Sequence, residues 1–322
     1  MENNLELSIF PQNYMKSYEG ANGNKICLTI HNEDYMVKFP ANPTKYENIS
    51  YTNNCICEYI GCHIFELAGI NVQKTYLGTY TQKNGNQKIV VACKDFTTPN
   101  ERLISFIGLK NQVIDSPQTG KGTELSSIKK SIEEQQLFDS EKLSEWFWDM
   151  FIVDALIGNW DRHNGNWGYL YNTFNNSCKL APVYDCASSL FPQADEDIMR
   201  SVLKNENELK SRVFSKPTSA IQLDSKRINY NDFINSLQDN DCNQALKRIL
   251  PKISKEKVNE IIDSTPYITN LQKAFYKTIL AARRDIILQR PFDKLIKLEQ
   301  ELIKNKCKKH DEKNYDDYGY GR

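Results

Sequence analysis

The segment 158–170, GNWDRHNGNWGYL, contains the residues whose types and spacing are most informative about chemistry. Asp161 and Asn166 have the D-x-x-x-x-N spacing of a phosphotransferase catalytic loop. In such a loop the carboxylate accepts or orients the proton of a substrate hydroxyl, and the asparagine amide oxygen binds Mg²⁺. Asp and Asn are also common in ordinary loops, so the spacing alone is weak. The fuller string DRHNGN between two tryptophans is the stronger signal.

A second carboxylate, Asp185, ends the apolar run LAPVYD further along the chain. Mg²⁺ prefers oxygen ligands, and one or two carboxylates with phosphate groups are enough to bind it. Asp185 and Asn166 on opposite strands of one short hairpin would form such a metal site. The alternative is an aspartate that ends a strand and starts a turn. Together with the catalytic-loop spacing, the metal site is the favoured interpretation.

Lys38 is the candidate phosphate-binding cation. Residues 34–40, DYMVKFP, alternate as a strand, with Tyr35, Val37 and Phe39 on one side and Met36 and Lys38 on the other. Burying a lysine beside apolar residues is costly without an anion, and a nucleotide phosphate supplies one. An edge strand whose lysine faces water remains the alternative.

Two further features near this strand complete the candidate site. Glu58, on the helix expected to follow, is the candidate ion-pair partner of Lys38, with Glu47 as the alternative. The run 20–25, GANGNK, stands just before the first strand. Its small residues allow backbone N–H groups to approach phosphate oxygens. The candidate phosphate-loop residues are Gly20, Ala21, Asn22 and Gly23.

The elements that must position these residues change in type along the chain. Residues 25–30 and 34–40 predict one hairpin, and residues 74–81 and 87–93 predict a second across Asn84-Gly85. Between them, residues 50–69 predict a helix that is capped by Ser50 or Thr52 and ends at Gly69.

After Phe96 the pattern is mainly helical. Two short strands are expected around 168–171 and 179–183. Helices are expected at 100–112, 124–137, 140–158, 194–213, 230–249, 254–263 and 268–305. We expect an α+β chain with an N-terminal lobe over 1–96, a helical lobe over 97–305 and a disordered tail over 306–322.

Composition excludes several classes of protein. The 41 basic and 41 acidic residues balance, which gives no indication of a nucleic-acid or lipid surface. The N-terminus has no Sec-type signal pattern, and the most apolar segment, 146–158, is too short to span a bilayer, so a soluble protein is expected. The nine cysteines show no paired CxxC spacing. Cys55, Cys57, Cys62 and His63 would not share one face of a helix, so free thiols in a reducing cytosol are expected.

Taken in order, the segments GANGNK, YMVKFP, VVACKDF, GNWDRHNGNWG and LAPVYD resemble the kinase domain of HipA-like serine/threonine kinases. The resemblance covers residues 14 to about 200 and, more loosely, the helical remainder. It implies an ATP- and Mg²⁺-dependent kinase with a protein-kinase-like two-lobed fold. That fold has a small β-rich N-lobe with one main helix and a larger helical C-lobe.

The resemblance also implies roles for individual residues. Asp161 would be the catalytic base, Asn166 and Asp185 would hold Mg²⁺, and Lys38 would contact the α- and β-phosphates. The resemblance also implies a hinge beside adenine, formed by backbone groups of Cys93, Lys94 and Phe96, and an autophosphorylation site at Ser17. His163 lies inside the same loop, where a structural hydrogen bond is its expected role. The Asp185 triplet is DCA rather than DFG, which departs from the usual kinase pattern.

The implied partners are proteins that carry a serine or threonine substrate hydroxyl, with no direct nucleic-acid or membrane partner. Full-length HipA toxins have an N-terminal subdomain that meets the antitoxin, so here a separate small antitoxin-like protein would have to supply that contact. The expected location is the bacterial cytoplasm, or host cells reached by a route without a Sec signal. The alternatives are a lipid or small-molecule kinase, and a toxin-like kinase module that acts by binding.

Overall fold

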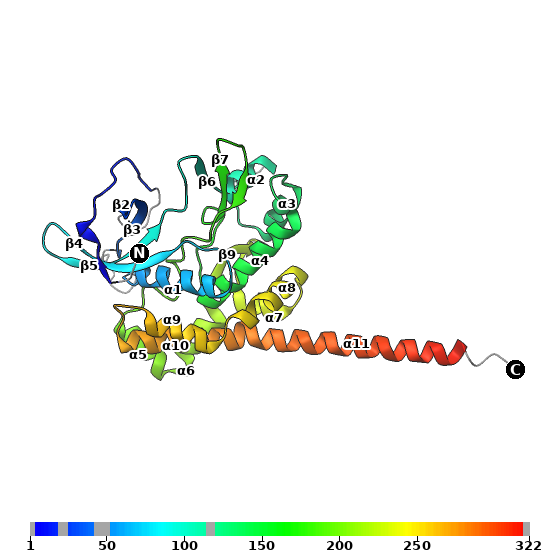
Figure 1. Ribbon diagram of the computed structural model, residues 1–322. Coiled ribbons are helices and arrows are strands. Elements are labelled where there is room, and N and C mark those ends of the chain that lie inside the picture. Colours follow the sequence, from blue (N-terminus) through cyan, green and yellow to red (C-terminus); the bar gives the residue numbers. More distant parts are fainter. Residues whose placement is uncertain (1–3, 19–24, 42–51, 114–119, 318–322) are drawn as a thin grey trace.

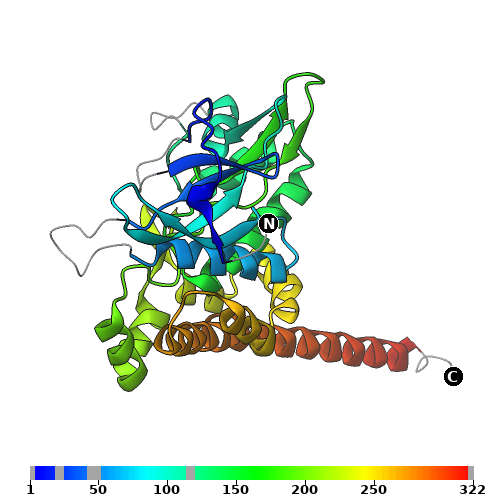
Figure 2. The same ribbon diagram turned by 60° about the vertical axis from the view of Figure 1, so that its left-hand side comes forward.

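The computed structural model describes residues 4–18, 25–41, 52–113 and 120–317, with side chains described up to residue 305. Figures 1 and 2 show a β-rich N-terminal part packed against a larger, mainly helical C-terminal part. The predicted α+β class is therefore confirmed.

The described residues of the N-terminal part form a five-stranded sheet in the order β1-β4-β5-β3-β2. Its strands are β1 (Leu5–Glu6), β2 (Lys25–Ile30), β3 (Glu33–Lys38), β4 (Thr75–Thr81) and β5 (Gln87–Lys94). β1 pairs parallel with β4, and the other pairs are antiparallel. Both predicted hairpins are confirmed. Gly85 in the second turn has φ +84°, a conformation that glycine adopts without steric cost.

The side chains of β3 alternate between two apolar clusters. Tyr35 and Val37 lie in a small cluster on one face of the sheet, whereas Met36 packs against the main core on the face covered by α1 (Asn54–Leu67). Lys38 has the same parity as Met36 and reaches Glu58 on α1. The predicted alternation is therefore confirmed, and it directs the amine of Lys38 toward the helix.

The ends of α1 differ in how well they were predicted. Gly69 follows the helix with φ +75°, as expected for a helix stop. The N-cap is Asn53, so capping by Thr52 is wrong, and Ser50 lies outside the described residues. The side chain of Asn53 makes no capping hydrogen bond. Its oxygen instead accepts from Gln272 Nε2 at 3.1 Å, so a tertiary contact determines its orientation.

Helix α4 (Ser140–Ile157) is the centre of the C-terminal part, and its second half is buried on all sides. It ends at Gly158, which has φ +66° and closes the helix in the left-handed conformation. The guanidinium of the buried Arg283 donates to the carbonyl oxygens of Ala155 and Leu156 at 2.7–3.2 Å. Because the DRHNGN string follows directly, the end of α4 determines where the catalytic-loop segment begins.

Around α4 lie two small sheets and a set of helices (Figure 1). The sheets are β6 (Glu101–Ser105), β7 (Gly168–Asn172) and β8 (Cys178–Leu180), and β9 (Thr218–Leu223) with β10 (Lys226–Asn229). The helices are α2 (Phe106–Val113), α3 (Leu125–Glu134), α5 (Glu196–Lys204), α6 (Glu206–Lys210), α7 (Tyr230–Ser236), α8 (Asn240–Ile249), α9 (Lys255–Ser264), α10 (Asn270–Arg283) and α11 (Arg290–Asp317).

Two strand regions were not predicted. The expected helix over 100–112 begins as strand β6, whose Leu103 pairs with Leu170 of β7, and becomes helix α2 only at Phe106. The partner strand is distant in sequence, so a local pattern carries no sign of it. The β9–β10 hairpin was also missed. Its turn residues Asp224 and Ser225 have φ +51° and +65°, a left-handed pair suited to a tight hairpin.

The C-terminal helices are more divided than expected. The expected helix over 230–249 is broken into α7 and α8 around Leu237, which has φ +58°. The segment expected as one helix over 268–305 comprises α10, a π-helical turn and α11. Helix α11 continues to Asp317, which differs from the disordered tail expected from residue 306. Four of residues 306–317 are lysines, which favour helix, and the segment directly continues α11.

Two further features of the described residues are the hydropathy of the helices and the state of the cysteines. Among the described helices, none combines the length and hydropathy needed to cross a bilayer. The eight cysteines with described side chains are free thiols, and seven of them are buried.

Candidate active site

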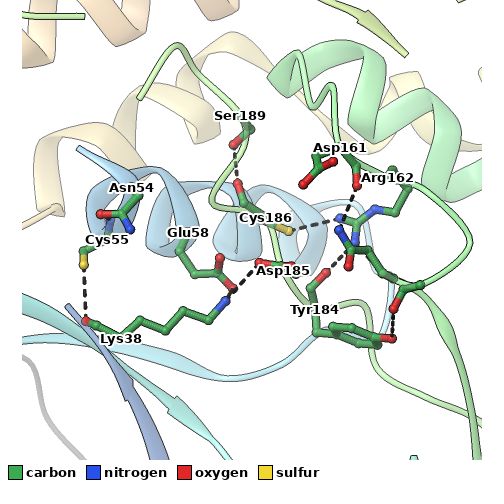
Figure 3. Close-up of polar contacts among 12 residues, drawn as sticks. Lys38, Asn54, Cys55, Glu58, Asp161, Arg162, Tyr184, Asp185, Cys186 and Ser189 are labelled. Carbon is green, nitrogen blue, oxygen red and sulfur yellow. Dashed lines mark hydrogen bonds and ion pairs between the residues drawn. The ribbon is translucent and has the colours of Figure 1, made fainter. Parts of the chain in front are cut away.

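An ion-pair cluster joins the five-stranded sheet, helix α1 and the segment that follows β8. Lys38 Nζ lies 3.1 Å from Glu58 Oε1 and 3.1 Å from Asp185 Oδ1. Figure 3 shows the amine between these two carboxylates. Glu58 is fully buried, whereas the side chain of Asp185 is 39% exposed. The contact with Glu58 is an ion pair by distance without the alignment of a hydrogen bond, while the contact with Asp185 has both.

The charges in this cluster shift one another's pKa values. Burial alone would lower the pKa of Lys38, but the carboxylates of Asp185 and Glu58 outweigh it and raise that pKa well above its usual range. The positive charge of Lys38 in turn lowers the pKa of Asp185, against the opposing effect of burial. The cluster therefore keeps a charged amine beside a charged carboxylate at neutral pH.

A second lysine stands beside the first. Lys25, at the start of β2, is the cross-strand partner of Lys38 on β3. Burial and the repulsion of Lys38 lower the pKa of Lys25. Like charges directly opposite on two strands are destabilising unless anions compensate them. The pair of amines, with the carboxylates that face them, marks this end of the β2–β3 hairpin as a place suited to a polyanion.

The catalytic-loop residues are held by bonds within the loop itself. Asn166 Nδ2 donates to the carbonyl oxygen of Asp161 at 2.8 Å, so the amide oxygen is the atom of Asn166 that could serve as a metal ligand. The Asp161 N–H donates to Asn159 Oδ1 at 3.0 Å. Burial raises the pKa of Asp161, and the nearby carboxylate of Asp185 adds to this effect.

Arg162 connects this loop to the rest of the site. Its guanidinium is buried and binds both carboxylate oxygens of Asp154 on α4, at 2.9 and 3.3 Å. It also donates to the carbonyl oxygen of Asn166 at 2.7 Å, to the carbonyl oxygen of Tyr184, and to Cys186 Sγ at 3.4 Å. Figure 3 shows the contacts of Arg162 with Tyr184 and Cys186 on either side of Asp185. Arg162 thereby links the catalytic loop to the residues on both sides of Asp185, through the carbonyl of Tyr184 and the thiol of Cys186.

Replacing Arg162 by leucine should lower the free energy of unfolding by about 3–5 kcal/mol, because the buried carboxylate of Asp154 loses its counter-charge. Urea denaturation followed by circular dichroism measures this change. Arg200→Leu is the matched control, since its ion pair with Glu196 is exposed and should contribute below about 1 kcal/mol. Equal losses in the two variants would contradict the assigned role of Arg162.

The segment expected to act as a hinge is already partly engaged in hydrogen bonds. Cys93 pairs with strands on both sides. The Lys94 N–H donates to the carbonyl oxygen of Lys74 at 2.8 Å, and the Lys94 carbonyl accepts from Gln73 Nε2 at 3.0 Å. The backbone groups of Lys94 are therefore satisfied within the protein. The ring of Phe96 lies 5.9 Å from that of Tyr184, next to Asp185.

Ser17 is exposed and lies on a segment fixed to this hinge. On either side of it, Lys16 Nζ lies 2.7 Å from Asp95 Oδ2, and the Tyr18 hydroxyl donates to the same oxygen at 2.8 Å. The candidate phosphate-loop residues Gly20, Ala21, Asn22 and Gly23, and the alternative partner Glu47, lie outside the described residues.

Two surface cavities lie elsewhere in the described part of the chain. One is lined by residues of α3, α4 and α8, and the other by the end of α1 and the start of β4. Neither is lined by Lys38, Asp161, Asn166 or Asp185. The candidate site therefore rests on the convergence of these side chains.

Comparison with known proteins identifies the family. The chain matches the family of HipA-like C-terminal domains over residues 17–266. The chain belongs to this family. The serine/threonine-protein kinase CtkA of Helicobacter pylori strain J99 is 45% identical over 287 residues, which cover 89% of this chain and 87% of CtkA.

Solved structures agree with the family match. The crystal structure of a Helicobacter pylori proinflammatory kinase CtkA has a TM-score of 0.86 at 43% identity, covering 92% of this chain and 98% of that chain. HipA of Shewanella oneidensis MR-1, solved with HipB and operator DNA, has a TM-score of 0.54 at 14% identity, covering 88% of this chain and 70% of that chain. This second likeness supports the fold alone. The predicted HipA-like family, kinase class and kinase-like two-lobed fold are confirmed.

Sequence reasoning missed several residues of this HipA-like site. Arg162, Asp154 and Lys25 were not among the candidate site residues. A signal existed for Asp154, because a carboxylate inside the apolar segment 146–158 requires a buried partner. Arg162, eight positions after Asp154, is the only arginine in the catalytic-loop string. Their pairing could not be inferred, because it depends on how the loop folds back on α4.

Proposed function

We propose that this chain is an ATP- and Mg²⁺-dependent protein kinase that transfers the terminal phosphoryl group to serine or threonine hydroxyls. The observation that carries the proposal is the convergence of Lys38, Glu58 and Asp185 next to a loop that presents Asp161 and Asn166. The relationship to CtkA, which is a serine/threonine-protein kinase, supports the same conclusion.

The donor set fits both cofactors. Asn166 and Asp185 offer one amide oxygen and one carboxylate, which suits Mg²⁺ because this ion completes its shell with phosphate and water oxygens. Lys38 and Lys25 place positive charge where the phosphates would lie. When bound, the metal would neutralise charge on the phosphates. Both backbone groups of Lys94 are engaged, and the Asp95 N–H donates to the carbonyl oxygen of Asp34 at 2.9 Å. The adenine contact at the hinge is therefore assigned to the Asp95 carbonyl and the backbone of Phe96.

The protein's own residues then perform three tasks. Asp161 accepts the proton of the substrate hydroxyl as that oxygen forms a bond to the γ-phosphorus. The bond from the γ-phosphorus to the bridging oxygen breaks, and ADP leaves with that oxygen. Lys38, held by Glu58, orients the phosphates that remain on ADP. Arg162 keeps the loop and the Asp185 segment at a fixed separation throughout.

Further proposals concern substrates, partners and organisation. Ser17 is the proposed autophosphorylation site, and its exposure beside the hinge contacts of Lys16 and Tyr18 supports this. The two lobes divide near residue 96, where the first sheet has ended.

The proposed partners are proteins that carry a serine or threonine substrate hydroxyl, and a separate small antitoxin-like protein. The site of action is the bacterial cytoplasm or a host cell.

Incubation with labelled ATP and Mg²⁺ should transfer label to serine or threonine in this chain or in an added protein. Chelation of the metal should return incorporation to background, because the phosphates then lose their neutralising charge. A panel of lipids, small alcohols and aminoglycosides, tested in parallel, separates the alternative kinase classes. Intact nucleotide binding with no label on any protein would count against the proposal.

A further inference from the structure

Within the catalytic loop, one hydrogen bond determines where the proton of His163 lies. The Gly165 N–H donates to His163 Nδ1 at 3.0 Å. A ring nitrogen that accepts a hydrogen bond carries no proton, so the proton of the uncharged ring is on Nε2. This contact is the structural loop bond expected from the sequence, but it leaves the second nitrogen as a donor.

That donor faces the candidate base. His163 Nε2 lies 3.9 Å from Asp161 Oδ1, and the two side chains are 45% and 39% exposed. The backbone holds the pair in register, because the His163 N–H donates to the Asp161 carbonyl at 2.8 Å and the Asn166 N–H donates to the His163 carbonyl at 2.9 Å. A shift of about 1 Å would bring Nε2 within hydrogen-bond distance of the carboxylate. Catalytic hydrogen bonds often tighten in this way when substrate binds.

We propose that His163 is a positioning residue that donates its Nε2 proton to Asp161 Oδ1 and leaves Oδ2 to accept the substrate proton. The proposal rests on the kinase function proposed above and assigns one further role within the same site. Two roles can be separated on this ring, because the loop bond uses Nδ1 and the positioning bond uses Nε2.

Two substitutions separate these roles. His163→Asn can place its amide oxygen near the position of Nδ1, which keeps the acceptor for Gly165 but removes the donor toward Asp161. His163→Gln can place its amide nitrogen near the position of Nε2, which keeps that donor. We expect kcat to fall about 100-fold in the Asn variant, because one aligned catalytic hydrogen bond is lost. In the Gln variant this bond is kept, and kcat should fall less than about 10-fold. KM for ATP should change little in either, and the reverse order of activities would overturn the proposal.

Gly165→Ala tests the same contact while the imidazole is kept. A Cβ at this position would lie 2.8 Å from His163 Cε1 and 3.0 Å from Nδ1, so the ring must move. We expect kcat to fall about as far as in His163→Asn, because a displaced ring cannot reach Asp161. Circular dichroism checks that the variant is folded. A folded variant with the wild-type kcat would contradict the positioning role.

A measurement without turnover separates this proposal from the proposed function. The chain has four histidines, and the signal lost in His163→Gln assigns His163 in ¹⁵N spectra of the whole protein. The shifts report which ring nitrogen carries the proton, and we expect Nε2. A proton on Nδ1 would overturn the positioning role even in an active kinase. An inactive wild-type protein with the proton on Nε2 would contradict the kinase function and leave this geometry supported.

Discussion

Replacing Asp161 by asparagine should lower the rate of phosphoryl transfer by about 10²–10⁴-fold, because the substrate hydroxyl then loses its proton acceptor. The fold should be retained, since the side chain is 39% exposed and the loop is held through the backbone carbonyl of Asp161. The measurement is transfer of label from ATP at saturating nucleotide. Nucleotide affinity within about 3-fold of wild type is the control that the site remains assembled.

The pH dependence of the kinase activity also tests Asp161 as the base. Burial raises the pKa of Asp161, and the Asp185 carboxylate adds to this. The base acts only when ionised, so activity should fall on the acid side at a higher pH than an ordinary aspartate would give. The Asp161→Asn variant should lose this acid limb. An unchanged rate, or an acid limb that persists in the variant, would refute the assignment of Asp161 as the base.

Replacing Lys38 by methionine should lower the free energy of unfolding by about 3–5 kcal/mol and weaken ATP binding. The reason is that the fully buried carboxyl group of Glu58 would lose its counter-ion. Asp185 contributes less to this loss, because its side chain is 39% exposed and water can compensate it. Urea denaturation measures the stability, and titration with ATP measures the binding.

Two controls make this result specific. Adding Glu58→Gln to Lys38→Met should restore much of the stability, because no buried charge is then left unpaired, while ATP binding stays weak. Lys277→Met removes an exposed ion pair with Asp263 and should cost below about 1 kcal/mol. If the double variant is no more stable than Lys38→Met alone, the buried pair with Glu58 does not explain the loss.

Much of the site could be predicted from the sequence because its signals are local. The alternation of β3 determines that Lys38 has the same parity as Met36, and a strand has the same period wherever it lies. Asp161 and Asn166 belong to one short loop, so their spacing constrains their geometry directly. The same reasoning predicted the two N-terminal hairpins, whose turns and strands are adjacent in the chain.

What the sequence could not decide depends on contacts between distant segments. Strand β6 was expected to be helical. The strand was missed because its partner β7 lies far along the chain. Lys38 and Asp185 lie 147 positions apart in the sequence, so no local pattern indicates that their side chains meet at 3.1 Å. Arg162 and Asp154 carry opposite charges in one region, but only the folded loop shows that they pair in the core.

The sequence by itself therefore determined which side chains this protein could use for phosphoryl transfer. It also determined the face of β3 on which Lys38 lies and the loop that contains Asp161 and Asn166. Only the tertiary structure decided which charges are paired and which backbone groups remain available. Local patterns follow the fixed periods of helix and strand, whereas ion pairs in the core form between segments that only packing brings together.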